Sequence, residues 1–196
     1  MNQHPHIQPD PFEGDAQVER SLVERVQAGD RSAFGALVER HMARAFRLAY
    51  RVLQQREDAE DLVQDAFLSA LQHIDAFDAR RPFWPWLSRI VVNRGLDLVA
   101  SRAVRATEPL PDDLFDRGAS PADAAERAEI LGRVRHELAL LPPRRRLVVQ
   151  LFELDGYSVS EIAELMETSP TTIRWHLHVA RRDLRRALSH LNGDED

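Results

Sequence analysis

Hydrophobic side chains recur at intervals of three and four residues along most of this chain, which is the period of an amphipathic helix. Between residues 18 and 74 the pattern falls into three blocks, and each block predicts one helix. At the first break Gly29 is placed to end one helix and Asp30 to cap the next. The apolar positions are Val18, Leu22, Val23 and Val26 in the first block, Phe34, Leu37, Val38, Met42, Phe46, Ala49 and Leu53 in the second, and Ala59, Leu62, Val63, Ala66, Phe67, Ala70, Leu71 and Ile74 in the third.

An aromatic and proline-rich turn follows at residues 77–85, and a fourth helix is predicted over residues 86–102. Its inward positions are Leu87, Ile90, Val91 and Leu98. The periodicity then gives way, between residues 103 and 120, to the proline and aspartate content of a linker. We therefore predict four segments, which are a flexible tail at 1–15, a first domain at 16–104, a linker at 105–120 and a second domain at 121–192.

The second domain is also predicted to be helical. Ser120 and Pro121 match an N-cap and a first helical residue, and the apolar stripe that follows ends at Pro142 and Pro143. Shorter helices are predicted at 144–152, 159–166 and 170–191. Because the sequence has neither alternating strand patterns nor internal repeats of solenoid length, the predicted fold class is all-α, in two small helical bundles.

The last two predicted helices have the form of a helix-turn-helix, whose second helix enters a DNA groove. Ser158 with Glu161 matches a capping box, and Ser169 with Pro170 starts the final helix after a tight corner. A solvated charged face would show the same periodicity. The capped first helix, the free amides at the start of the second and an outward Trp favour DNA binding instead. The outer face carries Thr171, Arg174, Trp175, His178, Arg182 and Arg185, opposite Ile173, Leu177, Ala180, Leu184, Leu188 and Leu191.

The charge of the chain is unevenly distributed. The net charge of −6 argues against DNA binding, but residues 57–65 hold five acidic and no basic residues, and residues 169–191 hold five arginines against Asp183 alone. All 26 basic residues are Arg, whose planar fork suits phosphates and guanine edges. With no cysteine, the chain has no disulfide, thiolate nucleophile or Cys-based metal site. The polar start and the lack of a long apolar run lead us to expect a cytoplasmic protein.

Two stretches resemble one protein family. The segment at 141–188 reads LPPRRRLVVQLFELDGYSVSEIAELMETSPTTIRWHLHVARRDLRRAL and looks like the fourth region of bacterial sigma factors of the extracytoplasmic-function (ECF) group. Earlier come FGALVERHMARAFRLAYRVLQQREDAEDLVQDAFLSAL and FWPWLSRIVVNRGLDLVASR, which are similar to the second region. The resemblance covers about residues 18–191. It implies a transcription initiation factor, associated with stress responses, that directs core RNA polymerase to promoters and assists strand opening.

The resemblance also implies which surfaces bind. Spacing alone suggests only a solubilising acidic face on the third helix, but in the family this segment docks on the coiled coil of the largest polymerase subunit. The fourth region contacts the flap region of the polymerase and the minus-35 duplex, and an anti-sigma factor is an expected further partner. The implied docking residues are Asp58, Asp61, Leu62, Gln64, Asp65 and Leu68. The implied minus-35 residues are Ser169, Thr171, Thr172, Arg174, Trp175, His176, His178, Arg181 and Arg182.

The turn and the fourth helix correspond to the family's minus-10 element reader, which captures the melted single strand. Cations interleaved with aromatic rings can hold a phosphate backbone and stack unpaired bases. We assign Phe83 and Trp86 to packing and expect Trp84 to be exposed. The implied minus-10 residues are Arg80, Arg81, Trp84, Arg89, Asn93, Arg94 and Asp97.

The final helix departs from the family pattern at three positions. Trp175 stands where family members carry a small residue, and His176 and Val179 stand where they often carry Arg. Arg can fork onto a guanine, whereas Val offers only an apolar contact, for example to a thymine methyl. The promoter sequence therefore cannot be carried over from the family.

No enzyme chemistry is predicted. His176 and His178 do not share a helix face, and the acidic run lacks the partners of a metal or acid-base site. We expect no catalytic residue, metal, cofactor or small-molecule substrate, and promoter opening driven by binding energy. Two alternatives remain open at this point. One is a stand-alone helix-turn-helix regulator, which predicts a receiver or ligand-binding domain upstream, and the other is a helical adaptor that binds only protein.

Overall fold

The computed structural model describes the backbone of residues 16–105 and 123–188, and these residues form helices and turns without a strand. The chain divides into two compact units, Met1–Arg102 and Ala103–Asp196. The all-α class predicted from the periodicity is confirmed. The predicted tail, nearly all of the predicted linker and the cap at Ser120 and Pro121 lie outside the described residues.

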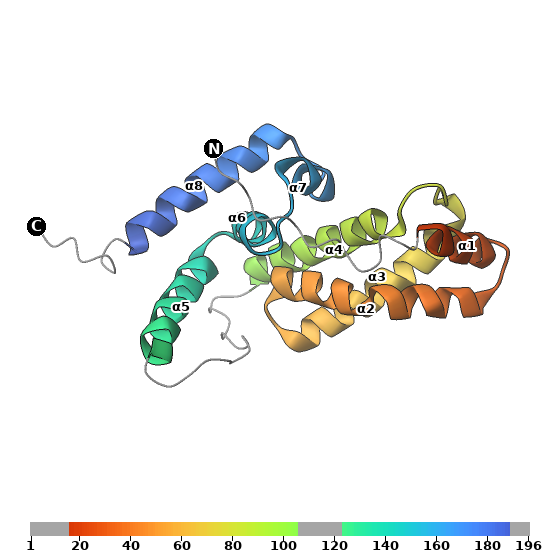
Figure 1. Cartoon of the computed structure of the whole chain (residues 1–196), viewed down its shortest axis with the longest axis horizontal. Coiled ribbons are helices and arrows are strands. Elements are labelled where there is room, and N and C mark those ends of the chain that lie inside the picture. Colours follow the sequence, from red (N-terminus) through yellow and green to blue (C-terminus); the bar gives the residue numbers. More distant parts are fainter. Residues whose placement is uncertain (1–15, 106–122, 189–196) are drawn as a thin grey trace, which may run out of the picture. The chain divides into compact units, whose positions relative to one another are not determined.

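The first unit is built from α1 (Ala16–Gln27), α2 (Arg31–Leu53), α3 (Arg56–His73), the short 3-10 turn η2 (Ile74–Ala76) and α4 (Phe83–Arg105) (Figure 1). The predicted break after α1 is confirmed. Gly29 has a φ of 94°, which glycine adopts without strain, and the Asp30 side chain accepts hydrogen bonds from the Ser32 and Ala33 amides. The fourth helix begins three residues earlier than predicted, at Phe83 in place of Trp86, so the arginine-containing loop before it is shorter.

The core of the first unit forms where α4 approaches α2 and α3 closely. At Gly95 an added Cβ atom would lie 2.8 Å from Val52 Cγ1 and 3.0 Å from Leu62 Cδ2. Not all of the predicted apolar positions are buried. Val18, Met42, Leu71 and Leu98 are exposed, because each apolar stripe is wider than the face that a neighbouring helix covers. The largest fully buried side chains of this unit are Phe83, Leu37, Leu62, Leu87, Val23, Val52, Val63 and Val91.

The second unit contains α5 (Asp123–Leu140), α6 (Pro143–Val149), the π-helical turn η3 (Gln150–Leu154), α7 (Val159–Leu165) and α8 (Pro170–Leu188). The capping box is confirmed, since the Ser158 hydroxyl accepts from the Glu161 amide and the Glu161 carboxylate accepts from the Ser158 amide. Glu167, with a φ of 50°, turns the chain between α7 and α8. The helix-turn-helix predicted from the sequence is therefore present, and the π turn before it was not predicted.

Gly95 and Gly35, which both lie within helices of the first unit, provide a matched test of the close packing. We expect Gly95→Ala to destabilise the protein by about 1 to 2 kcal/mol, because overpacking against Val52 outweighs the helix propensity gained by removing a glycine. Gly35→Ala meets no atom within 4 Å and should stabilise by up to about 1 kcal/mol. Chemical denaturation measures both changes, and a stable Gly95→Ala protein would contradict the packing described.

Candidate functional site

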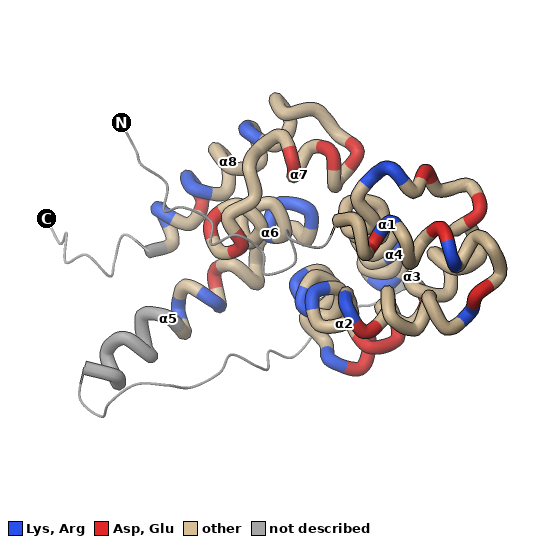
Figure 2. The backbone as a smooth tube through the Cα atoms, turned by 45° about the vertical axis from the view of Figure 1, so that its right-hand side comes forward, with Lys and Arg blue, Asp and Glu red and all other residues tan. Residues whose placement is uncertain are grey.

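The outward face of α8 remains uncovered within the second unit. Trp175 is 53% exposed, and Figure 2 shows basic positions recurring along this helix. At its start the Ser169 hydroxyl accepts from the Thr172 amide at 3.1 Å and lies 2.8 Å from the Thr172 hydroxyl. The predicted minus-35 residues that are exposed are Ser169, Thr171, Arg174, Trp175, His178, Arg181 and Arg182, and Thr172 and His176 are half-buried.

A second row of α8 residues is covered, which the sequence did not predict. Val179 is only 9% exposed, so it is not available for the apolar contact that a valine could offer to a base. The reason is that α8 packs against α5 and α6 as well as against α7. In the same row Asp183 accepts a hydrogen bond from Arg145 Nη1 of α6 at 3.0 Å.

Arg145 links α6 to the proposed DNA-reading side chains. Its guanidinium lies 5.6 Å from the centroid of the Trp175 ring, and the Trp175 and His176 rings meet edge to face at 4.9 Å. Burial, and then the nearby cations of Arg145 and Arg144, lower the pKa of His176 below its ordinary value of 6.5. His176 is therefore neutral at pH 7 and adds no charge for a phosphate. The sequence analysis missed Arg145, although the three consecutive arginines after Pro143 were a signal.

Two further arginines of α8 are held by carboxylates on the protein surface. Arg181 pairs with Glu153 at 2.7 Å, and Arg182 pairs with Asp183 at 3.0 Å. Exposed pairs of this kind contribute little to stability, so both guanidinium groups can exchange their partner for a phosphate at small cost.

In the first unit, a short loop between η2 and α4 carries Arg80 and Arg81, and both are exposed. Two Arg80 nitrogens, Nε and Nη2, donate to the Asp78 carboxylate at 2.9 and 3.0 Å, and the Arg80 hydrogen bond is the main reason why the pKa of Asp78 is lowered to about 2. The base of the loop is closed by aromatic rings, since Phe77 stacks on Trp86 with centroids 4.6 Å apart. The predicted packing role of Phe83 is confirmed, because its side chain is fully buried.

The expected exposure of Trp84 is wrong. Only 8% of this residue is exposed, because its ring stacks on His41 with centroids 5.9 Å apart and the Arg44 guanidinium lies 4.2 Å from the ring centroid. Trp86, which was assigned to the core, is half-buried. Among the other predicted minus-10 residues, Arg94 and Asp97 are exposed, and Arg89 and Asn93 are half-buried.

The predicted docking face on α3 is only partly available for binding. Leu62 is 1% exposed and belongs to the core, where it meets α4 at Gly95, so its assignment to docking is wrong. Asp58 is engaged by Arg102, whose Nη2 donates to it at 2.6 Å. The four remaining residues are exposed, and these are Asp61, Gln64, Asp65 and Leu68.

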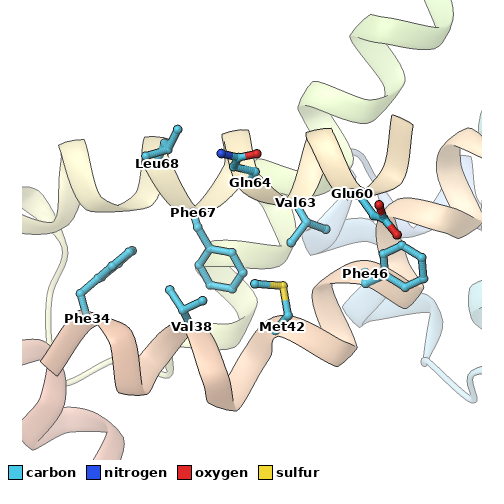
Figure 3. A pocket seen from close by; sticks show the side chains of 9 residues that line it. All are labelled: Phe34, Val38, Met42, Phe46, Glu60, Val63, Gln64, Phe67 and Leu68. Carbon is cyan, nitrogen blue, oxygen red and sulfur yellow. The ribbon is translucent and has the colours of Figure 1, made fainter. Parts of the chain in front are cut away.

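Next to this face lies an open apolar groove between α2 and α3, about 430 Å³ in volume (Figure 3). Phe67 points from α3 toward α2 across it. Gln64 and Leu68 belong both to the groove and to the acidic face, and Leu68 is 51% exposed. The groove is lined by Phe34, Val38, Met42, Phe46, Glu60, Val63, Gln64, Phe67 and Leu68. None of the described helices is long and apolar enough to cross a membrane.

Two family models match the chain. Sigma-70 region 2 matches residues 37–105, and Sigma-70, region 4 matches residues 131–184. The chain is 31% identical to the ECF RNA polymerase sigma factor SigW of Bacillus subtilis, over 88% of this chain and 97% of that relative. The structure of CnrH in complex with the cytosolic domain of CnrY has a TM-score of 0.61 at 31% identity, covering 92% of this chain and 100% of CnrH. The sigma factor RpoE of Bartonella quintana, in complex with the anti-sigma factor NepR, shows the fold alone, with a TM-score of 0.58 at 20% identity over 83% of this chain and 98% of RpoE.

The chain therefore belongs to the ECF group of the sigma-70 family of RNA polymerase sigma factors. It is a transcription initiation factor that binds core RNA polymerase, directs it to promoters through minus-10 and minus-35 elements and assists strand opening. It is not an enzyme. Both alternatives, the stand-alone regulator and the protein-binding adaptor, are set aside by this membership.

The ion pair of Asp58 with Arg102 should contribute to stability in a pH-dependent way. The hydrogen bond from Arg102 outweighs burial and lowers the pKa of Asp58 below 3.8. Because the folded pKa is the lower one, this stabilisation is present above about pH 4 and is lost as the pH falls through the folded value. We expect Asp58→Asn to destabilise by about 0.5 to 1 kcal/mol at pH 7, since the pair is partly exposed, and by less at pH 3. Equal losses by denaturant unfolding at both pH values would contradict this assignment.

Proposed function

We propose that the two parts of the chain divide the work of promoter recognition. Residues 16–104 dock on the coiled coil of the largest polymerase subunit and capture the minus-10 element, and residues 121–192 read the minus-35 duplex and contact the flap region. The observation that carries this proposal is the outward face of α8, where Arg174 and Trp175 remain exposed while the opposite side packs on three helices. We also propose that the protein acts in the cytoplasm, where the polymerase works.

The minus-35 contact is proposed for the exposed side chains of α8. Arg174 has the reach and the planar fork to bind a guanine edge, and Arg181 and Arg182 can exchange their surface carboxylates for phosphates. Trp175 offers an apolar ring to thymine methyl groups, and Arg145 supports that ring from α6. Neutral His176 serves as a spacer beside Trp175 and not as a phosphate ligand.

The minus-10 contact is proposed for the loop and for one side of α4. Arg80 and Arg81 lie exposed on the loop, and Arg89, Asn93 and Asp97 recur every four residues along α4. A cationic loop beside a polar helix face can hold the backbone of a displaced strand and bind the edges of its bases. Because Trp84 is buried, the half-buried ring of Trp86 is the one that can stack on a base in this conformation.

Polymerase docking is proposed for Asp61, Gln64, Asp65 and Leu68 together with the groove. Exposed carboxylates give charge-assisted hydrogen bonds to a basic partner helix and speed its association. The groove beside them supplies the apolar contact that surface ion pairs alone do not provide. Since CnrH is described in complex with the cytosolic domain of CnrY, we propose an anti-sigma factor as a second protein partner of this chain.

The direct test is to add the purified protein to core RNA polymerase on genomic DNA and to map the transcript starts. We expect starts that share an upstream motif and that vanish without the added protein. No promoter-specific initiation would refute the proposal, and a shared motif would supply the minus-10 and minus-35 sequences for the experiments that follow.

Replacing two exposed residues of α8 should weaken minus-35 recognition. We expect the double variant Arg174→Ala, Trp175→Ala to bind the mapped minus-35 duplex at least about tenfold more weakly, because one base contact contributes about 1 to 3 kcal/mol. Fluorescence anisotropy with cognate and scrambled duplexes measures the loss, and Arg20→Ala on α1 controls for the change in net charge. Undiminished cognate binding would mean that α8 docks in another register.

Leu68 allows the docking surface to be tested without disturbing the core. Leu68→Asp should weaken core polymerase binding at least about tenfold, because it places a carboxylate at the edge of the apolar groove. Gln17→Asp introduces the same charge at an exposed position of α1, away from α3, and should leave binding unchanged. If both variants bind core polymerase equally well, the docking surface lies elsewhere.

A further inference from the structure

The first helix of the chain touches the proposed minus-10 loop at one of its ends. The Gln27 side-chain amide at the end of α1 donates to two backbone carbonyls, those of Ile74 and Phe77, at 2.8 Å each. Ile74 begins η2 and Phe77 is the last residue before the loop. One amide group therefore holds the entry of the loop through its backbone, independently of the side chains that the loop carries.

The same face of α1 holds the other end of the loop. Glu19 lies eight residues before Gln27, which places the two side chains on one side of the helix. Its Oε2 atom accepts from the backbone amide of Phe83, the first residue of α4, at 3.0 Å. Its Oε1 atom lies 2.7 Å from Nε2 of the buried His41 on α2. Glu19 thus joins α1, α2 and the start of α4.

Glu19 is suited to this position by its charge. The first amides of a helix lack partners within it, and their partial positive charge favours a carboxylate. Burial raises the pKa of Glu19, but the hydrogen bonds from His41 and the Phe83 amide outweigh it, so the pKa is lowered below 4.5. The ionised carboxylate is therefore the form held here at neutral pH.

The loop is consequently attached at both ends while its centre remains open. Between the two attachment points, Arg80 and Arg81 are exposed, and the Asp78 carboxylate holds the Arg80 guanidinium. Such a loop presents its cations in a fixed place before any DNA arrives. A preformed binding loop avoids the cost of ordering when the ligand binds.

We propose that α1 is a brace for promoter opening, with Glu19 and Gln27 as positioning residues that hold the minus-10 loop ready for the displaced strand. This inference rests on the proposed assignment of the loop to the minus-10 element. Region 2 of the family matches residues 37–105. The inference therefore extends the opening machinery to a helix that lies outside this range. In this role both residues act on the backbone of the loop, and neither contacts DNA itself.

The test uses the full chain assembled with core polymerase, and variants that change the hydrogen bonds but little of the shape. Gln27→Glu keeps the size of the side chain, removes both donors and sets a carboxylate against two carbonyls. Glu19→Ala removes both contacts of the carboxylate, whereas Glu19→Gln keeps an acceptor for the Phe83 amide. Gln17→Glu and Glu24→Ala are matched controls, since both residues lie exposed on the same helix.

Three readouts separate positioning from a general loss of structure. We measure permanganate reactivity of the mapped promoter, binding of a single-stranded oligonucleotide that carries its minus-10 element, and binding of the minus-35 duplex, all well below the unfolding temperature. We expect Gln27→Glu and Glu19→Ala to lose about tenfold in opening and in single-strand capture, with minus-35 binding unchanged. Glu19→Gln should recover most of the loss, and both controls should behave like the original protein.

Other outcomes overturn the proposal in distinguishable ways. Parallel losses in all three readouts, following the fall in melting temperature, would show a purely structural role. The variant Arg80→Ala, Arg81→Ala serves as reference for the loop itself. If it impairs opening and the α1 variants do not, the brace is refuted and the loop assignment stands. If opening is intact in all of these variants, the loop assignment fails and the brace with it.

Discussion

The close approach of α4 to α2 and α3 at Gly95 decides which surfaces the first unit can offer. Leu62 packs beside this glycine in the core and is not available for docking, while its neighbour Asp61 is exposed. Buried residues recur along α4 from Phe83 to Leu96, so its polar side keeps one direction relative to the acidic side of α3. Docking on the polymerase and capture of the melted strand can therefore occupy different faces of one rigid unit.

The second unit separates packing from recognition within one helix. The row that includes Val179 and Asp183 is covered by neighbouring helices, and Arg145 of α6 ties Asp183 in place at 3.0 Å. Arg174 and Trp175 remain exposed and make no contribution to the buried core. A helix packed against three neighbouring helices can enter a groove as a rigid body, so its exposed contacts are not weakened by ordering costs.

A net charge of −6 is compatible with DNA binding because acidic and basic residues are segregated along the chain and two arginines of α8 are only weakly paired. Arg181 and Arg182 pair with surface carboxylates at 2.7 and 3.0 Å, and such pairs are readily exchanged for phosphates. The acidic residues of α3 lie in the other unit, where they suit a basic protein partner. Where the charges gather within each unit thus matters more than the net charge of the chain.

The sequence by itself determined the helices and the caps between them, because caps and periodicity are local, but it missed the start of α4 at Phe83 and the π-helical turn η3. Asp30 and Ser158 form the predicted caps, and the helix-turn-helix stands where it was predicted. The resemblance of the sequence to a known family identified the class of function, because motifs are also local patterns. Only the tertiary structure decided which faces are covered. Periodicity places Leu62 and Val179 on helices, and the sequence places Trp84 in a turn, but the burial of all three depends on neighbours distant in sequence. The contacts of Gln27 and Glu19 with the loop join residues 50 and 64 positions apart, and no local pattern contains that information.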